Sequence, residues 1–180
     1  AELEAVQRRV EEALWHLGQI RPVATPVFRH IAEADWASAW KEHYHVLHIG
    51  RRIVVRPSWR EYAPAPGEVV ITLDPGQAFG SGVHPTTHMA LVALEHFVQS
   101  GSDVLDLGTG SGILAIAAAR LGARYVLALD NDALAVEVAL ANVAFNDVEE
   151  VVSVQLGSLA EVRGYYDVIV VNILAQVIME

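Results

Sequence analysis

Residues 106–112 read DLGTGSG and separate an apolar run at Asp103–Leu107 from a helical pattern at Ile113–Leu121. Three glycines in alternation let the backbone come close to a ligand, and the amides that open the following helix would point at it. The same spacing also suits a tight turn from strand to helix with no ligand. The stretch therefore predicts a β-strand, a close turn and an α-helix, with a binding site as the favoured interpretation of the turn.

The pattern of strands and helices continues on the C-terminal side of this turn. A second apolar strand is expected at Tyr125–Asp130 and a second helix at Ala133–Phe145, with short strands at residues 151–155 and 167–171. These last runs are rich in valine and isoleucine, which is typical of strands buried on both faces of a parallel sheet. We predict a doubly wound α/β domain whose strands all end at one edge, where ligands bind in this class of fold.

The N-terminal part follows a different pattern, which predicts an accessory and linker segment over residues 1–75. Apolar residues at steps of three and four predict a helix over residues 3–17. The other elements expected are a strand at 27–31, a helix at 35–43 capped by Asp35, and strands at 51–57 and Val69–Leu73. Residues 76–180 form the predicted core, which we expect to be partial because its sequence ends shortly after a fourth strand.

Composition narrows the classes of function. The formal net charge is −10, and only 12 basic residues are scattered through the chain, which argues against broad nucleic-acid binding. A basic protein partner fits this charge, although an acidic balance is also common in soluble proteins. No apolar run is long enough to span a bilayer. The absence of cysteine favours a reducing cytoplasm. Composition does not indicate an oligomeric state.

Spacing then separates two nucleotide-binding classes. The dinucleotide fingerprint places its third glycine where this chain has Ile113, so a nicotinamide cofactor is disfavoured and an oxidoreductase stays only as an alternative. Asp130 ends the strand after the turn, where a carboxylate can accept hydrogen bonds from both ribose hydroxyls of a nucleoside. Capping of the helix at Ala133 is assigned to Asp132, which leaves Asp130 for the ribose.

Three motifs together resemble a known family. The turn and the acidic strand end are similar to the first two motifs of class I methyltransferases. Residues 73–87, LDPGQAFGSGVHPTT, resemble the loop of the ribosomal-protein methyltransferase family PrmA, and residues 172–175, NILA, resemble its catalytic motif. The resemblance implies a Rossmann-like core, S-adenosylmethionine as cofactor, and N-methylation of lysine or α-amino groups on a protein of the large ribosomal subunit. A methyltransferase acting on another protein or a small amine is the main alternative, and a non-catalytic binding module is a further one.

The resemblance also implies which residues form the cofactor site. They are Thr87, Gly108, Asp130 and Asn172. To these the residue pattern itself adds Asp106 and Gly110 of the glycine-rich stretch and Phe79 of the loop as candidates for cofactor contact. Phe79 would cover the ligand as part of a mobile lid hinged on the neighbouring glycines, although an ordinary surface loop fits the same residues equally well. Thr87 could instead cap the helix that leads into the first core strand.

Asn172 is the candidate catalytic residue. A side-chain carbonyl can accept the hydrogens of a substrate amine and aim its lone pair without titrating. The alternative is a polar turn residue after a strand. Ile173 and Leu174 replace the prolines found in many amino-group methyltransferases, which argues against a nucleic-acid base as substrate. His84 and His88 lack a visible third ligand, so no metal is expected.

Overall fold

The computed structural model describes residues 2–24, 26–28, 44–74 and 82–173, and the chain divides into two compact units, Ala1–His43 and Tyr44–Glu180. The predicted helix at 35–43 and most of the predicted strand at 27–31 lie outside the described residues. Val27 and Phe28 belong to no strand, so that prediction is wrong at the two positions that the structure describes. The division predicted at residues 75 and 76 stays a prediction.

The first unit contains helix α1 (Glu2–Gly18), as the spacing of apolar residues predicts. Val6, Val10 and Leu17 leave 53%, 40% and 50% of their surface exposed, so this apolar stripe has no cover among the described residues. No helix in the described part of the chain is both long and apolar enough to cross a membrane.

The second unit is built on a parallel sheet with the strand order β6-β5-β4-β7. Its strands are β4 (Asp103–Leu107), β5 (Tyr125–Asp130), β6 (Val152–Leu156) and β7 (Val168–Val171). Leu105 lies beside Leu127 on one side and Ile169 on the other, so the strands are in register at mid-length. Helices α4 (Ile113–Leu121) and α5 (Ala133–Phe145) make the crossovers, and the predicted α/β fold is confirmed.

The two faces of this sheet are covered differently. On one face, Val104, Val126 and Ala128 belong to the main core with α4 and α5. On the other face, Leu105 and Leu127 belong to a small second cluster, against which Val162 and Tyr166 pack. In β7 buried and exposed positions alternate, and Ile169 is 59% exposed. Strand β6 likewise ends in exposed residues, and Leu156 is 61% exposed. The expectation of burial on both faces is therefore wrong for β6 and β7, which form the two edges of this sheet in the described part of the chain.

A second, three-stranded sheet joins the same core. It contains β1 (Leu47–Ile49), β2 (Ile53–Pro57) and β3 (Val69–Leu73), and β2 and β3 are parallel. Strand β1 was not predicted from the sequence. Residues 113–118 of α4 are all buried because they meet this sheet on one side and β4 and β5 on the other. Burial all round explains the continuous apolar sequence of α4.

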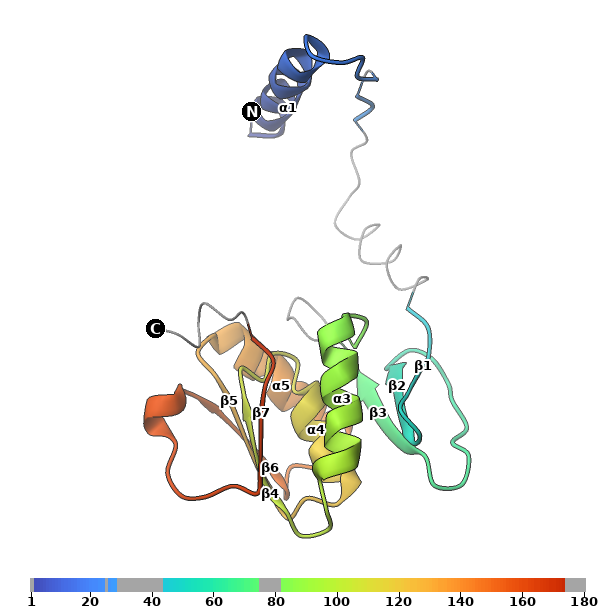
Figure 1. Ribbon diagram of the computed structural model, residues 1–180, viewed down its shortest axis with the longest axis vertical. Helices are drawn as coiled ribbons and strands as arrows, with labels where there is room; N and C mark the ends of the chain where they lie inside the picture. The colour runs from blue at the N-terminus through green and yellow to red at the C-terminus, as the bar shows by residue number, and fades with distance from the viewer. Residues whose placement is uncertain (1, 25, 29–43, 75–81, 174–180) are drawn as a thin grey trace. The chain divides into compact units, whose positions relative to one another are not determined.

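Helix α3 (Pro85–Phe97) packs against α4 and leads into β4 (Figure 1). Near its end, Glu95 accepts hydrogen bonds from the backbone N–H groups of Arg51 and Arg52, at 2.7 and 2.6 Å. The contact fixes α3 to the turn between β1 and β2. At the other end of α3, Thr87 is hydrogen-bonded to Asn172 after β7, so the beginning of α3 lies at the edge of the main sheet where the strands end.

Candidate functional site

The glycine-rich turn is held against the end of the neighbouring strand. The N–H groups of Gly108 and Thr109 both donate to the carbonyl of Leu129, at 2.8 and 2.9 Å. Gly108 has φ +76°, a left-handed conformation that favours glycine. A Cβ atom added at Gly108 would also collide with Cγ2 of Ile173, the residue after Asn172. The turn and the segment after β7 therefore approach each other as closely as their side chains allow.

Replacing Gly108 by alanine should lower the free energy of unfolding by about 2–4 kcal/mol, because left-handed strain and the collision with Ile173 add together. Gly101→Ala is the matched control. Gly101 has φ +90°, and nothing lies within 4 Å of an added Cβ, so this variant should carry the strain of about 1–2 kcal/mol alone. Urea unfolding of both variants tests the difference, and equal losses would show that the Ile173 contact carries no weight.

Asp106 lies beneath the turn and is fully buried. One carboxylate oxygen, Oδ2, accepts from the Thr109 hydroxyl at 2.7 Å and from the Ala115 N–H at 3.1 Å. The other, Oδ1, is buried and has no hydrogen-bond partner among the described residues. Burial, with a smaller contribution from the charge of Asp130, raises the pKa of Asp106 to about 6 against the lowering effect of the two hydrogen bonds. A buried acceptor of this kind favours a cationic ligand nearby.

Asp130 ends β5 and faces the same turn. Its Oδ2 accepts from the N–H of Gly110 at 2.8 Å, and its Oδ1 accepts from the N–H of Asp132 at 3.1 Å. Each oxygen keeps a second lone pair for a ligand hydroxyl. Asp132 caps α5 by accepting from the N–H of Leu134 at 2.9 Å, which confirms its predicted role as a cap.

Thr87 and Asn172 meet from opposite ends of the sequence. Thr87 is 1% exposed and lies in the first turn of α3, and its hydroxyl oxygen accepts from Nδ2 of Asn172 at 3.3 Å. The cap of α3 is His84, whose ring nitrogen accepts from the N–H of Thr86. The alternative that Thr87 is the cap is therefore wrong, and its hydroxyl is directed to Asn172 instead.

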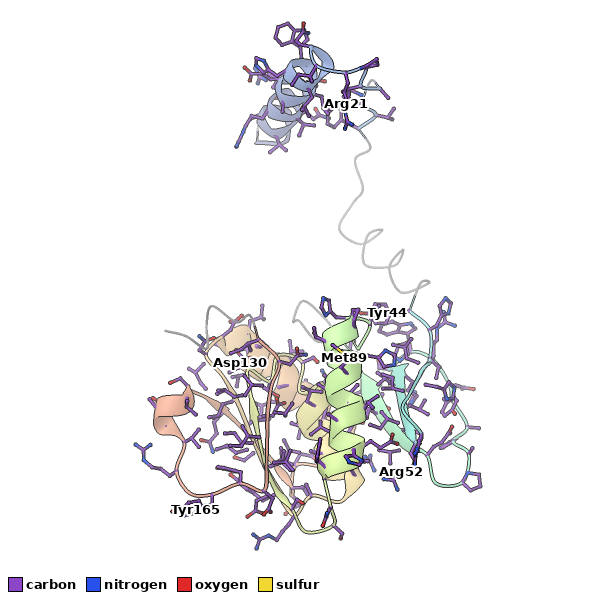
Figure 2. All side chains as sticks on the ribbon, viewed as in Figure 1. Arg21, Tyr44, Arg52, Met89, Asp130 and Tyr165 are labelled. Carbon is purple, nitrogen blue, oxygen red and sulfur yellow. The ribbon has the colours of Figure 1, made fainter. Side chains whose placement is uncertain are left out.

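The structure gathers most of the predicted site residues at the edge where β4, β5 and β7 end. Asp106 lies near the end of β4, and Gly108 and Gly110 come from the turn after it. Asp130 ends β5, and Asn172 directly follows β7. Figure 2 labels Asp130 at this edge, on the side where α3 begins. Phe79 lies outside the described residues, so its role as a lid stays a prediction. Among the residues that the structure describes, no group of three or more histidine and acidic side chains could hold a metal ion.

Sequence reasoning missed two buried asparagines on α5. Asn142 and Asn146 are each 2% exposed, and their side chains reach the backbone of β3 and of the turn. The available signal was a pair of amides four residues apart on an otherwise apolar helix, because a buried amide needs hydrogen-bond partners. Ser158 caps a short 3-10 helix (Leu159–Glu161).

Comparison with known proteins gives one consistent family. The sequence model described as "Ribosomal protein L11 methyltransferase (PrmA)" matches residues 1–180. A ribosomal protein L11 methyltransferase of Chloroflexus aurantiacus is 58% identical over 159 residues, which are 88% of this chain and 48% of that protein. A protein of the same name from Herpetosiphon aurantiacus is 45% identical over 192 residues, covering 95% of this chain and 60% of its own length.

A solved structure agrees with these relatives. The ribosomal protein L11 methylase of Lactobacillus delbrueckii subsp. bulgaricus superposes with a TM-score of 0.69 at 42% identity, over 76% of this chain and 70% of that one. The chain spans about half to three fifths of the length of the curated relatives described above.

Proposed function

This chain belongs to the ribosomal protein L11 methyltransferase family, and from that membership we propose that it holds the S-adenosylmethionine site of a protein methyltransferase. The observation that carries the proposal is the buried Oδ1 of Asp106, which lacks a hydrogen-bond partner among the described residues and lies beneath a glycine-rich turn. S-adenosylmethionine is a cation with a sulfonium and an ammonium group. A buried carboxylate beside a turn open to close approach suits such a ligand.

The residues at the edge of the main sheet contact different parts of the cofactor. The Asp130 carboxylate accepts hydrogen bonds from the ribose hydroxyls. The backbone of the turn at Gly108 and Gly110 lies against the ligand, because glycine lets the backbone come close. Asp106 balances the positive charge from below. Thr87 and Asn172 close the site on the side of α3 and β7. When bound, the cofactor supplies an electrophilic methyl group on sulfur.

Asn172 orients the amine that accepts this methyl group. Its Nδ2 is held by Thr87, which directs the carbonyl oxygen Oδ1 to the hydrogens of a substrate amine. Methyl transfer is an in-line displacement, so the lone pair must point at the methyl carbon. A lysine amine has an ordinary pKa near 10.4 and must lose a proton before it reacts. Asn172 does not titrate, so it orients the neutral amine by accepting its hydrogens but does not remove the proton, which must leave to solvent beforehand.

The substrate follows from the family. We assign as substrate the large-subunit ribosomal protein that gives the relatives their name, with lysine or α-amino groups as acceptors. A net charge of −10 on this chain is suited to a lysine-rich partner. A ribosomal substrate and the absence of cysteine favour a cytoplasmic enzyme.

Calorimetric titration with S-adenosylhomocysteine tests the cofactor site, and a separate titration with NADH tests the alternative of a nicotinamide cofactor. We expect the chain to bind S-adenosylhomocysteine and not NADH. Asp130→Ala should weaken binding by about 10- to 100-fold, since hydrogen bonds to a charged group are lost. Asp132→Ala is the matched control, because it removes only the cap of α5 and should lower stability by about 1 kcal/mol with unchanged affinity. Preference for NADH by a folded sample would contradict the proposal.

A further inference from the structure

The carboxamide of Asn142 connects two segments that are far apart in the sequence. Its Nδ2 donates to the carbonyl of Ser111 in the glycine-rich turn at 2.9 Å. The same group donates to the carbonyl of Asp74 at 3.3 Å, and Oδ1 accepts from the N–H of Asp74 at 3.0 Å. Both amide hydrogens and the carbonyl oxygen are thus engaged with backbone groups. Asn142 is 2% exposed, so water does not substitute for these contacts.

Asn146 repeats half of this arrangement one helical turn later. Its Oδ1 accepts from the N–H of Thr72 at 2.8 Å, and its Nδ2 donates to the carbonyls of Thr72 and Asn142, both at 2.7 Å. Four residues of helix rise about 6 Å, and two extended residues rise about 6.6 Å, so the two amides match Thr72 in β3 and Asp74 directly after it. They therefore bind the edge of β3 that β2 does not occupy.

The two asparagines differ in one respect. Asn146 binds the backbone of Thr72 in β3 and Asn142 binds that of Asp74 directly after it, but only Asn142 also reaches the turn that carries Gly108 and Gly110. The turn meets α5 at a second point as well, because a Cβ atom on Gly112 would lie 3.3 Å from Ala139, three residues before Asn142 on the same face. The hydrogen bond to Ser111 therefore fixes the direction of a turn that already packs against this helix.

We propose that Asn142 is a positioning residue of the cofactor site, which fixes the glycine-rich turn to the backbone that follows β3. The chain runs from Asp74 to α3, where Thr87 is bound by Asn172. Asn142 therefore binds the backbone directly after β3 and connects it to the glycine-rich turn. Asn172 binds Thr87 in the first turn of α3 and connects it to the segment after β7. This inference rests on the proposed function for its ligand but not for its geometry.

Asn142→Ala and Asn146→Ala form a matched pair of variants. Each removes a side-chain amide that is hydrogen-bonded to the backbone at or directly after the end of β3, so both should lower the melting temperature. Only Asn142→Ala should also raise the dissociation constant for S-adenosylhomocysteine, by about tenfold, as happens when a supporting partner behind a bound group is removed. Asn142→Ser keeps a single hydroxyl donor and should fall between wild type and alanine, and it replaces Asn142→Ala if that variant does not fold.

Hydrogen exchange supplies a readout that needs no ligand. Amides of residues 108–115 should exchange faster in the Asn142 variant and at the wild-type rate in Asn146→Ala. Equal loss of affinity in both alanine variants, or unchanged affinity and exchange in the Asn142 variant, would overturn the inference. If the wild-type chain binds no S-adenosylhomocysteine, the proposed function fails, and exchange in the turn alone decides whether Asn142 positions it.

Discussion

Asp106→Asn is expected to stabilise the folded chain and at the same time to weaken cofactor binding. Burial raises the pKa of Asp106 from the ordinary 3.8 to about 6. The folded state therefore holds a proton that the unfolded state releases, and stability falls as pH rises from about 4 to about 6. Above that range the buried carboxylate destabilises the fold by about 3 kcal/mol. Asparagine removes this charge and keeps an acceptor for Thr109 and Ala115, so we expect a gain of about 1–3 kcal/mol at neutral pH.

The loss of binding arises from the same charge. A neutral amide cannot balance a cationic ligand, so the dissociation constant for S-adenosylmethionine should rise by roughly 10- to 100-fold. In the wild type, affinity should decline as pH falls through about 6, where Asp106 becomes protonated, whereas Asp106→Asn should show no such decline. Urea unfolding and calorimetry between about pH 5 and pH 8 measure both effects.

Asp103→Asn is the control for this variant. Asp103 lies at the opposite end of β4 and pairs with Arg124, whose side chain is 70% exposed. An ion pair so exposed contributes little to folding stability. Asp103→Asn should therefore lower the free energy of unfolding by less than about 1 kcal/mol and leave the affinity for S-adenosylmethionine unchanged. An Asp106→Asn variant that is no more stable than wild type, or that binds S-adenosylmethionine normally, would refute the role given to this carboxylate.

The core was predictable from the sequence because local signals and tertiary structure agree there. The strand Asp103–Leu107 runs directly into the glycine-rich turn, the apolar strand Tyr125–Asp130 ends in an acidic residue, and Asp132 caps the helix that follows. Parallel strands must end at one edge, so the meeting of Gly108, Asp130 and Asn172 followed from topology alone. The bounds of these elements differ from the prediction by at most a residue or two.

The rest depends on contacts that no local pattern encodes. Strand β1 has three residues and contains His48, and it is a strand because it pairs with β2 rather than because of its own sequence. Asn142 is hydrogen-bonded to Asp74, 68 residues away in the sequence, and Asn172 is hydrogen-bonded to Thr87, 85 residues away. A sequence can show that a buried amide needs partners, but only the packed chain shows which backbone groups supply them.

Asn172→Ala is expected to lower kcat for methyl transfer by about 10²- to 10³-fold, the range seen when one preorganised polar group at a reacting centre is removed. Cofactor affinity should fall by less than about tenfold, because only the contact to Thr87 is lost on that side. Single-turnover transfer of labelled methyl groups to the ribosomal protein, with cofactor saturating, separates the two effects. Thr87→Val removes the hydroxyl that orients Asn172 and should give an intermediate rate.

Asn172→Asp provides the sharper test of how Asn172 acts. Its carboxylate still accepts hydrogens from the amine, but its negative charge favours the protonated ammonium form and raises the pKa of the bound amine. At neutral pH the rate should therefore fall, and the rise of the rate with pH should move to higher pH than in wild type. An aspartate variant with the wild-type pH profile would mean that Asn172 does not contact the amine. Loss of activity that no increase in pH restores would point instead to a role in holding α3 and β7 together.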